Sequence, residues 1–252
     1  NAVRQQTTNG QGGNDLRIDQ ASGRAIYQWQ SFDIGAASSV RFEMATGADG
    51  SALNRVVGAN GSVSPSQIFG KLSSNGQVLL VNQSGVLFGA GASVNVGGLI
   101  ASTLDVGDSD FMAGFTNSLF GLTPTFQARN LADPLAPYSQ PGNFVLVDSG
   151  AAIVAPSGGR VMLLAESVEN RGRIETPAGQ TVLAAGNAVY LQTPTAERLY
   201  ASEANADIPA LRGLLVEVDG PGRVSNLGQV LTERGNTTLV GLAVNQNGLI
   251  SA

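Results

Sequence analysis

The sequence predicts an all-β fold, a right-handed parallel β-helix with an N-terminal β cap and excursions outside the helix. A short unit recurs about every 20 residues, and it holds strands of three to six residues between Asn and Gly corners. Gly contributes 33 of the 252 residues and charged residues only 13%, so the chain turns often and buries most side chains. Because so short a unit cannot enclose a core alone, successive units are expected to stack and pair strand on strand.

Two repeated units support this stacking. The first has the form apolar residue, three residues, Gly, one residue, apolar residue, and it occurs at Val81-Gly85-Leu87, Leu146-Gly150-Ala152, Val168-Gly172-Ile174, Val224-Gly228-Val230 and Val244-Gly248-Ile250. The second begins at Gly159, Gly179 and Gly235. Asn170, Asn226 and Asn247 stand near corners. We expect them to form amide ladders along the stack, or to serve only as residues that tolerate turns.

The first part of the chain, 1–60, is expected to hold the cap and the first coils. Segments 24–29 and 39–44 alternate apolar and polar residues, which indicates hairpin-like strands. An uncovered first coil would leave an open strand edge, and a cap would remove it.

The β-helix is expected to run through 61–104, and its most informative stretch is 75–103. That stretch contains no Lys, Arg, Asp or Glu, and Asn, Ser and Gly interrupt its apolar pieces. This pattern indicates short buried strands joined by tight turns rather than a membrane helix.

Two segments break the period, 105–143 and 187–213, and both are expected to leave the helix, which then continues through 144–186 and 214–252. Asp108 or Ser109 is expected to cap a short helix. The aromatic residues of the first excursion would cover a sheet face. The whole chain, 1–252, is expected to be one domain.

Composition excludes several functions. The formal net charge of −5 gives no basic footprint for nucleic acid. The chain has no His and no Cys, which excludes a Ser-His-Asp triad, a thiolate nucleophile and the common zinc sites. No cofactor and no metal are expected. The first residue is Asn rather than Met, which fits a removed signal peptide or a trimmed chain, and the end directly after a repeat unit suggests a fragment.

Five motifs follow one another in a fixed order: Trp29-Gln30-Ser31-Phe32-Asp33-Ile34-Gly35, Val40-Arg41-Phe42, Leu53-Asn54-Arg55-Val56, Ser66-Gln67-Ile68-Phe69-Gly70 and the segment 75–103. Together they resemble the two-partner-secretion domain of filamentous-haemagglutinin-like exoproteins, most of all its high-molecular-weight adhesin branch. The resemblance is dense from about 15 to 105 and weaker beyond.

The family's hallmark, Asn-Pro-Asn-Gly-Ile, is matched here by Asn82, Gln83, Ser84, Gly85 and Val86. The chain keeps the Asn and the Gly and departs at the other three positions, so the turn geometry is favoured over the literal motif. The resemblance implies that these five residues carry the secretion signal.

Four further residues of the matching motifs are candidates for partner recognition: Trp29, Phe32, Asn54 and Arg55. For Trp29 and Phe32, packing in the core of the cap is the favoured alternative. For the hallmark segment, the alternative is an ordinary corner of the β-helix.

The resemblance implies an N-terminal targeting and fold-nucleating domain of a secreted adhesin-type exoprotein from a Gram-negative bacterium. POTRA domains of a cognate outer-membrane β-barrel transporter would capture it in the periplasm, after signal peptide removal. A downstream passenger in the same chain would bind host or matrix glycans. No enzyme is expected.

Two other functions are weighed against this one. The excursions suggest a carbohydrate-binding adhesive module. A polysaccharide-active enzyme needs clustered acids, for which Glu166, Glu169 and Glu175 are the nearest candidates.

Two charged groups are weighed as well. Asp105, Asp108 and Asp110 have spacings that suit a cation, although a helix N-terminus or a solvated loop is favoured. Arg171 and Arg173 flank Gly172 and are expected to share one solvated face.

Overall fold

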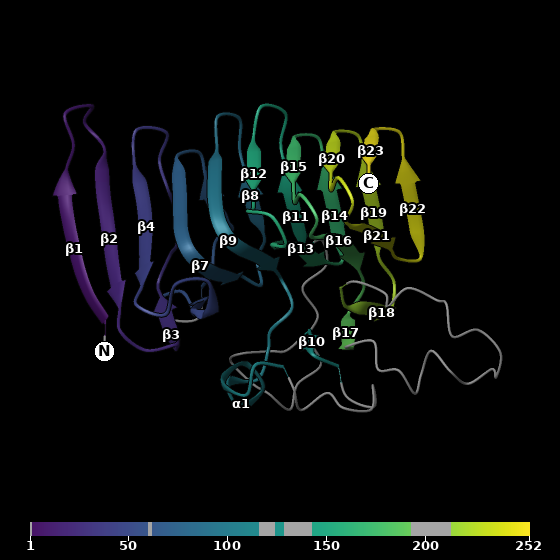
Figure 1. The fold of residues 1–252 in the computed structure, drawn as a ribbon, viewed down its shortest axis with the longest axis horizontal. Coiled ribbons are helices and arrows are strands. Elements are labelled where there is room, and N and C mark those ends of the chain that lie inside the picture. Colours follow the sequence, from purple (N-terminus) through teal and green to yellow (C-terminus); the bar gives the residue numbers. More distant parts are fainter. Residues whose placement is uncertain (1, 60–61, 116–123, 129–142, 193–212) are drawn as a thin grey trace.

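The computed structural model describes residues 2–59, 62–115, 124–128, 143–192 and 213–252. Figure 1 shows their strands stacked side by side from one end of the molecule to the other, with the N-terminal strands at one end and the C-terminal strands at the opposite end. The strands of the helix form three faces, and each coil contributes a strand to each face in turn. The predicted parallel β-helix is confirmed.

Face 1 carries most of the long ladder. Its strands lie in the order β1 (Ala2–Thr8), β2 (Asn14–Gln20), β4 (Ser39–Met44), β7 (Lys71–Val81), β9 (Ser93–Ser102), β12 (Ala152–Val154), β15 (Arg173–Glu175), β20 (Gln229–Leu231) and β23 (Leu249–Ser251). Strands β7 and β9 are long enough to bend round a corner, and their ladder is interrupted between Ser74 and Gln77. Their second halves therefore belong to face 2.

Face 2 and face 3 complete each coil. Face 2 contains β3 (Arg24–Trp29), β5 (Ser51–Val56), the ends of β7 and β9, β13 (Arg160–Ala165), β16 (Gln180–Ala185) and β21 (Asn236–Val240). Face 3 contains β6 (Ser66–Ile68), β8 (Val86–Phe88), β11 (Phe144–Val147), β14 (Ser167–Asn170), β19 (Arg223–Asn226) and β22 (Ala243–Gln246). A short 3-10 helix, η1 (Gly47–Asp49), joins β4 to β5.

The interior core consists of apolar side chains in stacked rows. On face 3 the row is Val86, Val145, Val168 and Val224, and Val244 continues its register on the last coil, where it is exposed. These side chains repeat once per coil, so each coil extends the apolar column begun by its neighbour. The second predicted unit is confirmed, because Arg160, Gln180 and Asn236 pair in register directly after Gly159, Gly179 and Gly235.

The first predicted unit is right for its last three copies and wrong for the other two. Strand β11 pairs Val145, not Leu146, with Val168. The cause is the connection 148–151, which is longer than the equivalent connection 171–172 and shifts the register. Val81-Gly85-Leu87 lies at another corner, between face 2 and face 3.

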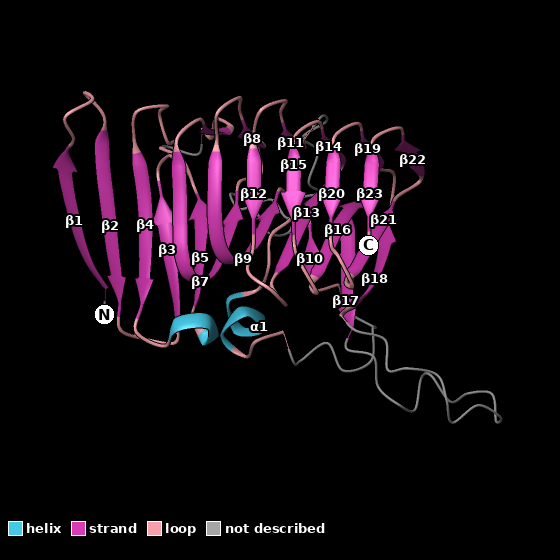
Figure 2. Cartoon of the chain, turned by 45° about the horizontal axis from the view of Figure 1, so that its top comes forward, coloured by secondary structure: helices cyan, strands magenta, loops and turns pink. Residues whose placement is uncertain are grey.

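A second core covers the outer side of face 2. The cover consists of helix α1 (Asp108–Met112) and a small antiparallel sheet of β10 (Phe126–Gln127), β17 (Ala188–Gln192) and β18 (Leu215–Asp219). Figure 2 shows these elements beside the β-helix. Phe111 and Phe126 are fully buried there. The expectation that aromatic residues cover a sheet face is confirmed, while 116–123, 129–142 and 193–212 lie outside the described residues.

Two local expectations are wrong. The N-cap of α1 is Gly107, because Asp108 is already the first helical residue and neither Asp108 nor Ser109 forms a side-chain cap. Segments 24–29 and 39–44 do not form a hairpin, since β3 pairs in parallel with β5, and β4 with β2 and β7. The antiparallel hairpin at this end is β1 with β2.

Thr103, just after β9, is expected to tolerate loss of its hydroxyl. In the described part of the chain, Thr103 Oγ1 is a buried side-chain atom without a hydrogen-bond partner. Thr103→Val keeps the shape and removes that unpaired group, so the free energy of unfolding should stay equal or rise by up to about 1 kcal/mol. Urea denaturation checks this. Ser102→Ala, which removes a hydroxyl bonded to Leu104 N and O, is the control that should lose stability, and an equal loss in Thr103→Val would contradict the expectation.

Candidate functional site

The hallmark segment forms the corner between face 2 and face 3, and Asn82 is its centre. The Asn82 side chain is fully buried. Its Nδ2 donates to Ser64 O and to Ser66 Oγ, both at 2.9 Å, and its Oδ1 accepts from Ser84 N at 3.0 Å. The amide thus joins two consecutive coils and also sets the turn that follows it.

Gly85 closes this turn. Its N–H donates to Asn82 O at 3.0 Å, and its carbonyl accepts from Ser66 N at 3.0 Å. Its φ of 126° lies where residues with a side chain are strained, and a Cβ there would lie 2.9 Å from the Phe144 ring. These two constraints explain why Gly is kept although the Pro of the hallmark is absent.

Ser84 joins the turn to the preceding coil. Its Oγ donates to Val63 O at 2.7 Å, so the side chains of Ser84 and Asn82 both hold the loop before β6. Gln83 is half-buried at the tip, and Val86 is fully buried at the start of β8. In the folded domain, therefore, little of the five-residue segment is accessible to a partner.

Trp29, Phe32 and Asn54 form one cluster at the N-terminal end of the interior. Trp29 Nε1 donates to Asn54 Oδ1 at 3.0 Å, and the Phe32 ring meets the Trp29 ring edge-on at a centroid distance of 5.3 Å. Asn54 Nδ2 also donates to Leu79 O at 3.2 Å. Such geometry is that of core packing with a satisfied buried amide.

Arg55 is buried and makes a tie between β5 and the start of the first excursion. Its guanidinium contacts Asp105 Oδ1 and Asp108 Oδ1, each at 2.8 Å, and donates to Val106 O at 2.8 Å. Burial disfavours the charged form, but the two carboxylates outweigh it, so the pKa of Arg55 is raised.

This tie also accounts for two of the three acids considered for a cation. The charges of Asp105 and Asp108 face Arg55, and Asp110 lies in the first turn of α1. Over the described ranges, no group of three or more Asp, Glu, His or Cys residues could hold a metal ion. The favoured alternative, a helix N-terminus, describes Asp108 and Asp110.

The structure places these candidates close to one another. Arg55 pairs in register with Val81, directly before Asn82, and Asn54 pairs with Leu80. Trp29 lies one strand further on, in the ladder of β3 with β5. These candidates therefore lie in the two coils that precede the strand leading into the corner. Asp105 is the partner that sequence reasoning missed, because 50 residues separate it from Arg55.

An amide ladder runs along another corner. Asn170 Nδ2 donates to Asn226 Oδ1 at 2.7 Å, and Asn226 Nδ2 donates to Gln246 Oε1 at 2.8 Å. The prediction that Asn247 is the third member is wrong, since Gln246 is the residue that pairs with Asn226. Gln246 also carries a side-chain amide, so it continues the ladder in place of an Asn.

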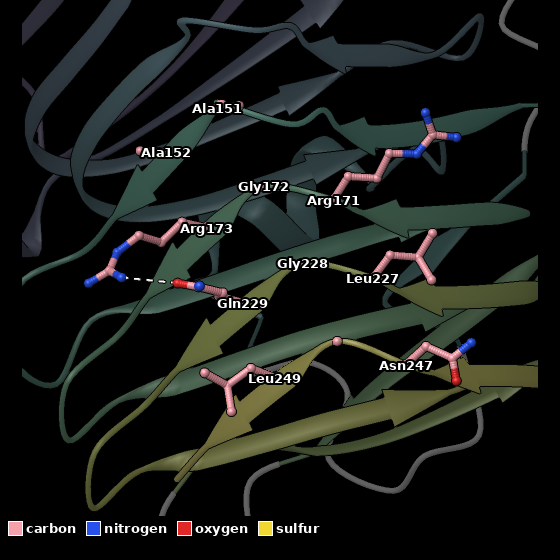
Figure 3. Close-up of a pocket in the computed structure, with 12 residues that line it drawn as sticks. Ala151, Ala152, Arg171, Gly172, Arg173, Leu227, Gly228, Gln229, Asn247 and Leu249 are labelled. Atoms are coloured by element: carbon pink, nitrogen blue, oxygen red, sulfur yellow. Dashed lines mark hydrogen bonds between the residues drawn. The ribbon is translucent and has the colours of Figure 1, made fainter.

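Arg171 and Arg173 border a shallow groove of 650 Å³ whose floor includes Gly172, Gly228 and Gly248, drawn in Figure 3. Both are exposed, as expected, but they extend in opposite directions from the corner at Gly172. The two side chains thus border one solvated groove, as expected, although their guanidinium groups point apart.

The acids beside this groove are already paired. Glu169 contacts Arg171 at 2.6 Å, and Glu175 contacts Arg173. Glu169 lies on face 3 and Glu175 on face 1, while Glu166 lies in the connection before β14. A glycoside hydrolase needs two unpaired carboxylates that face each other across the sugar bond, and these three Glu residues are not arranged in that way.

The described residues contain no helix that is both long and apolar enough to span a membrane.

The whole chain is similar to proteins of one known family. A family model described as "TPS secretion domain" matches residues 1–252. Two curated relatives are heme/hemopexin-binding proteins of Haemophilus influenzae, one of them from strain ATCC 51907 / DSM 11121 / KW20 / Rd. Each is 45% identical, over 91 and 94 residues, or 36% and 37% of this chain. The matched region spans only 9% and 10% of those relatives.

A solved structure with a similar fold is the crystal structure of the HMW1 secretion domain from Haemophilus influenzae. Its TM-score is 0.73 at 23% sequence identity, and the match covers 100% of this chain and 56% of that one. At this identity the likeness concerns the fold.

Proposed function

Because the chain belongs to the family of TPS secretion domains, we propose that it targets a secreted adhesin-type exoprotein to its cognate transporter and nucleates folding of the passenger. Members of this family are parts of secreted or surface-located exoproteins of Gram-negative bacteria, and they work with a cognate outer-membrane transporter. The finer proposal concerns how that transporter recognises this chain.

We infer that the POTRA domains of the transporter capture the chain in the periplasm before it folds, after a signal peptide has been removed. The burial of Asn82 supports this order of events, because all of its bonds are made within the folded domain. An unfolded segment 75–103 has free backbone groups and no charges, which suits strand addition to a sheet edge. Asn54, Arg55 and Phe32 are buried in the folded domain and Trp29 is half-buried, so these residues are more available to a partner before folding.

Folding at the cell surface then hides the signal. Closing the corner at Asn82 aligns β8 on β6, and each later coil extends the same rows towards a downstream passenger. Adhesion to host or matrix glycans is proposed for that passenger. Catalysis is not proposed, since Glu169 and Glu175 are engaged by Arg171 and Arg173.

Asn82→Ala should abolish transporter-dependent export while leaving periplasmic expression intact. The same change removes three hydrogen bonds from a buried site, so the free energy of unfolding should fall by about 2 kcal/mol. The measurement is the amount of chain in the medium and in the periplasm of cells that carry the cognate transporter. Asn170→Ala is the matched control, because it also removes three hydrogen bonds of a fully buried corner amide but lies outside the hallmark segment, and it should be exported normally. Undiminished export of Asn82→Ala would sink the proposal.

A further inference from the structure

Strands β17 and β18, called the strap from here on, form an antiparallel hairpin outside the β-helix. Figure 1 shows both strands below the stacked coils, and all five residues of each strand pair in register. On β17 burial alternates: Val189 and Leu191 are buried, and the residues on either side of them are half-buried. Strand β10 adds only two residues to the edge of the hairpin. The strap is thus a cover with one apolar side.

The chain leaves the β-helix for the strap and returns to it at a single position of the coil. Gly186 N donates to Ala165 O at 3.0 Å, and Arg223 N donates to Glu166 O at 2.9 Å. In this ladder each N–H reaches the carbonyl just before the paired residue, so Gly186 and Gly222 both lie beside Glu166. A Cβ on Gly222 would lie 2.6 Å from Gly186 N, so the departing and returning backbones are in contact.

The coil that carries the strap would be complete without it. The preceding coil passes from face 2 to face 3 through one residue, Glu166. Removing 186–221 would leave Gly222 as the single residue at the same step. The strands on either side of this step already pair in register with both neighbouring coils. The stacking of the coils therefore does not depend on the strap.

The strap covers an apolar row on the outer side of face 2. Ile100, Met162 and Val182 pair in register there, and they belong to the same buried core as Val189 of the strap. In the next coil the row continues with Thr238, which is only half-buried. The row is therefore apolar where it is buried under the cover, and it carries a hydroxyl where more water reaches it.

Gln180 holds the returning end of the strap against face 2. Its Nε2 donates to Leu214 O and its Oε1 accepts from Leu214 N, both at 2.8 Å. Gln180 is 2% exposed, and its amide satisfies the Leu214 backbone as a neighbouring strand would. The residue that pairs with Gln180 in the next coil is Asn236.

We infer that the strap is a separable cover that closes over a β-helix already formed. The dependence runs one way, because the coils stack without the strap, whereas a two-stranded hairpin is only marginally stable by itself. Opening the strap breaks the two Gln180 bonds and the short pairing with β10, and it uncovers the row at Met162. The described strand pairs of the coils stay intact. In the folded protein the strap therefore opens and closes as a unit of its own.

The first test removes 186–221 from the full chain. Met162→Thr and Val182→Thr accompany the deletion, so that the uncovered row carries the residue type of Thr238. We expect a folded β-helix with one cooperative thermal transition by circular dichroism.

The matched control carries the same two substitutions and removes 186–222. It leaves no residue at the step after Ala185, so the next strand shifts by one residue and its side chains face the wrong way. This variant should show no cooperative transition. Failure of the first variant to fold, or equal transitions in the two variants, would overturn the proposal.

Hydrogen exchange of the intact chain tests the opening itself. In the wild type, amides of the strap should exchange faster than those of β13. Gln180→Ala should speed exchange of the strap about tenfold and leave β13 unchanged, because it removes two bonds to the strap and no ladder bond. Asn236→Ala is the matched control in the same row and should leave strap exchange unchanged. Equal acceleration of the strap and β13 would mean that they open together, and an unaltered strap would mean that Gln180 does not hold it. Either result overturns the proposal.

Discussion

Replacing Arg55 by Ala is expected to lower the free energy of unfolding by about 3–5 kcal/mol. The change leaves the carboxylate of Asp105, whose side chain is 5% exposed, without its cation, and it leaves Val106 O without a donor. An uncompensated buried charge is costly because water cannot replace the lost partner. Urea denaturation followed by fluorescence of Trp29, the single tryptophan, measures the effect.

Two variants serve as controls for Arg55. Arg41→Ala removes an exposed ion pair with Glu43, which should cost no more than about 1 kcal/mol. Arg55→Met combined with Asp105→Leu removes both charges and should recover most of the lost stability. If Arg55→Ala unfolded at the same urea concentration as Arg41→Ala, the buried tie would not hold the excursion to β5.

Gly179→Ala is expected to cost about 3 kcal/mol or to prevent folding altogether. Gly179 sits at the corner between face 1 and face 2, where a Cβ would lie 1.9 Å from Gly159 O of the preceding coil. Gln180 N donates to that same carbonyl at 3.1 Å, so the coils can separate only by losing a ladder bond. Thermal unfolding by circular dichroism measures the loss.

The matched control is Gly23→Ala, at the same kind of corner in an earlier coil. Its Cβ would find Thr46 Cγ2 as the nearest atom, at 3.9 Å, and Gly23 O still accepts from Ser51 N at 2.8 Å. This variant should stay within about 0.5 kcal/mol of the wild type. Equal stability of the two variants would contradict the close stacking of the corner.

The stacking could be predicted from the sequence where the backbone alone dictates it. Gly159, Gly179 and Gly235 recur because coils approach closely there, and the structure pairs the residues that follow them in register. The register at Leu146 was wrong because the longer connection 148–151 changes which residue faces inward. Connection lengths carry no periodic signal, so the sequence pattern alone cannot detect this shift.

In the candidate site too, local features could be predicted from the sequence and contacts between distant segments could not. The turn at Asn82 was predicted from local turn chemistry, which depends on neighbouring residues. The partners of Asn82, Ser64 and Ser66, belong to the preceding coil, and their positions follow only from the assembled stack. The tie of Arg55 to Asp105 joins two segments that no local rule connects. The motif match makes Arg55 a candidate recognition residue, and the folded structure adds its buried ion pair with Asp105.

The most direct test of recognition before folding compares two variants that both destabilise the domain. Asn82→Ala alters the signal, while Gly179→Ala disturbs the stack and leaves Asn82–Val86 intact. Each chain is co-expressed with the transporter, and its capture by the periplasmic POTRA domains is measured by cross-linking. The account predicts that Gly179→Ala is captured as well as the wild type and that Asn82→Ala is not. Equal loss of capture in both variants would mean that the transporter recognises the folded domain, which contradicts the account.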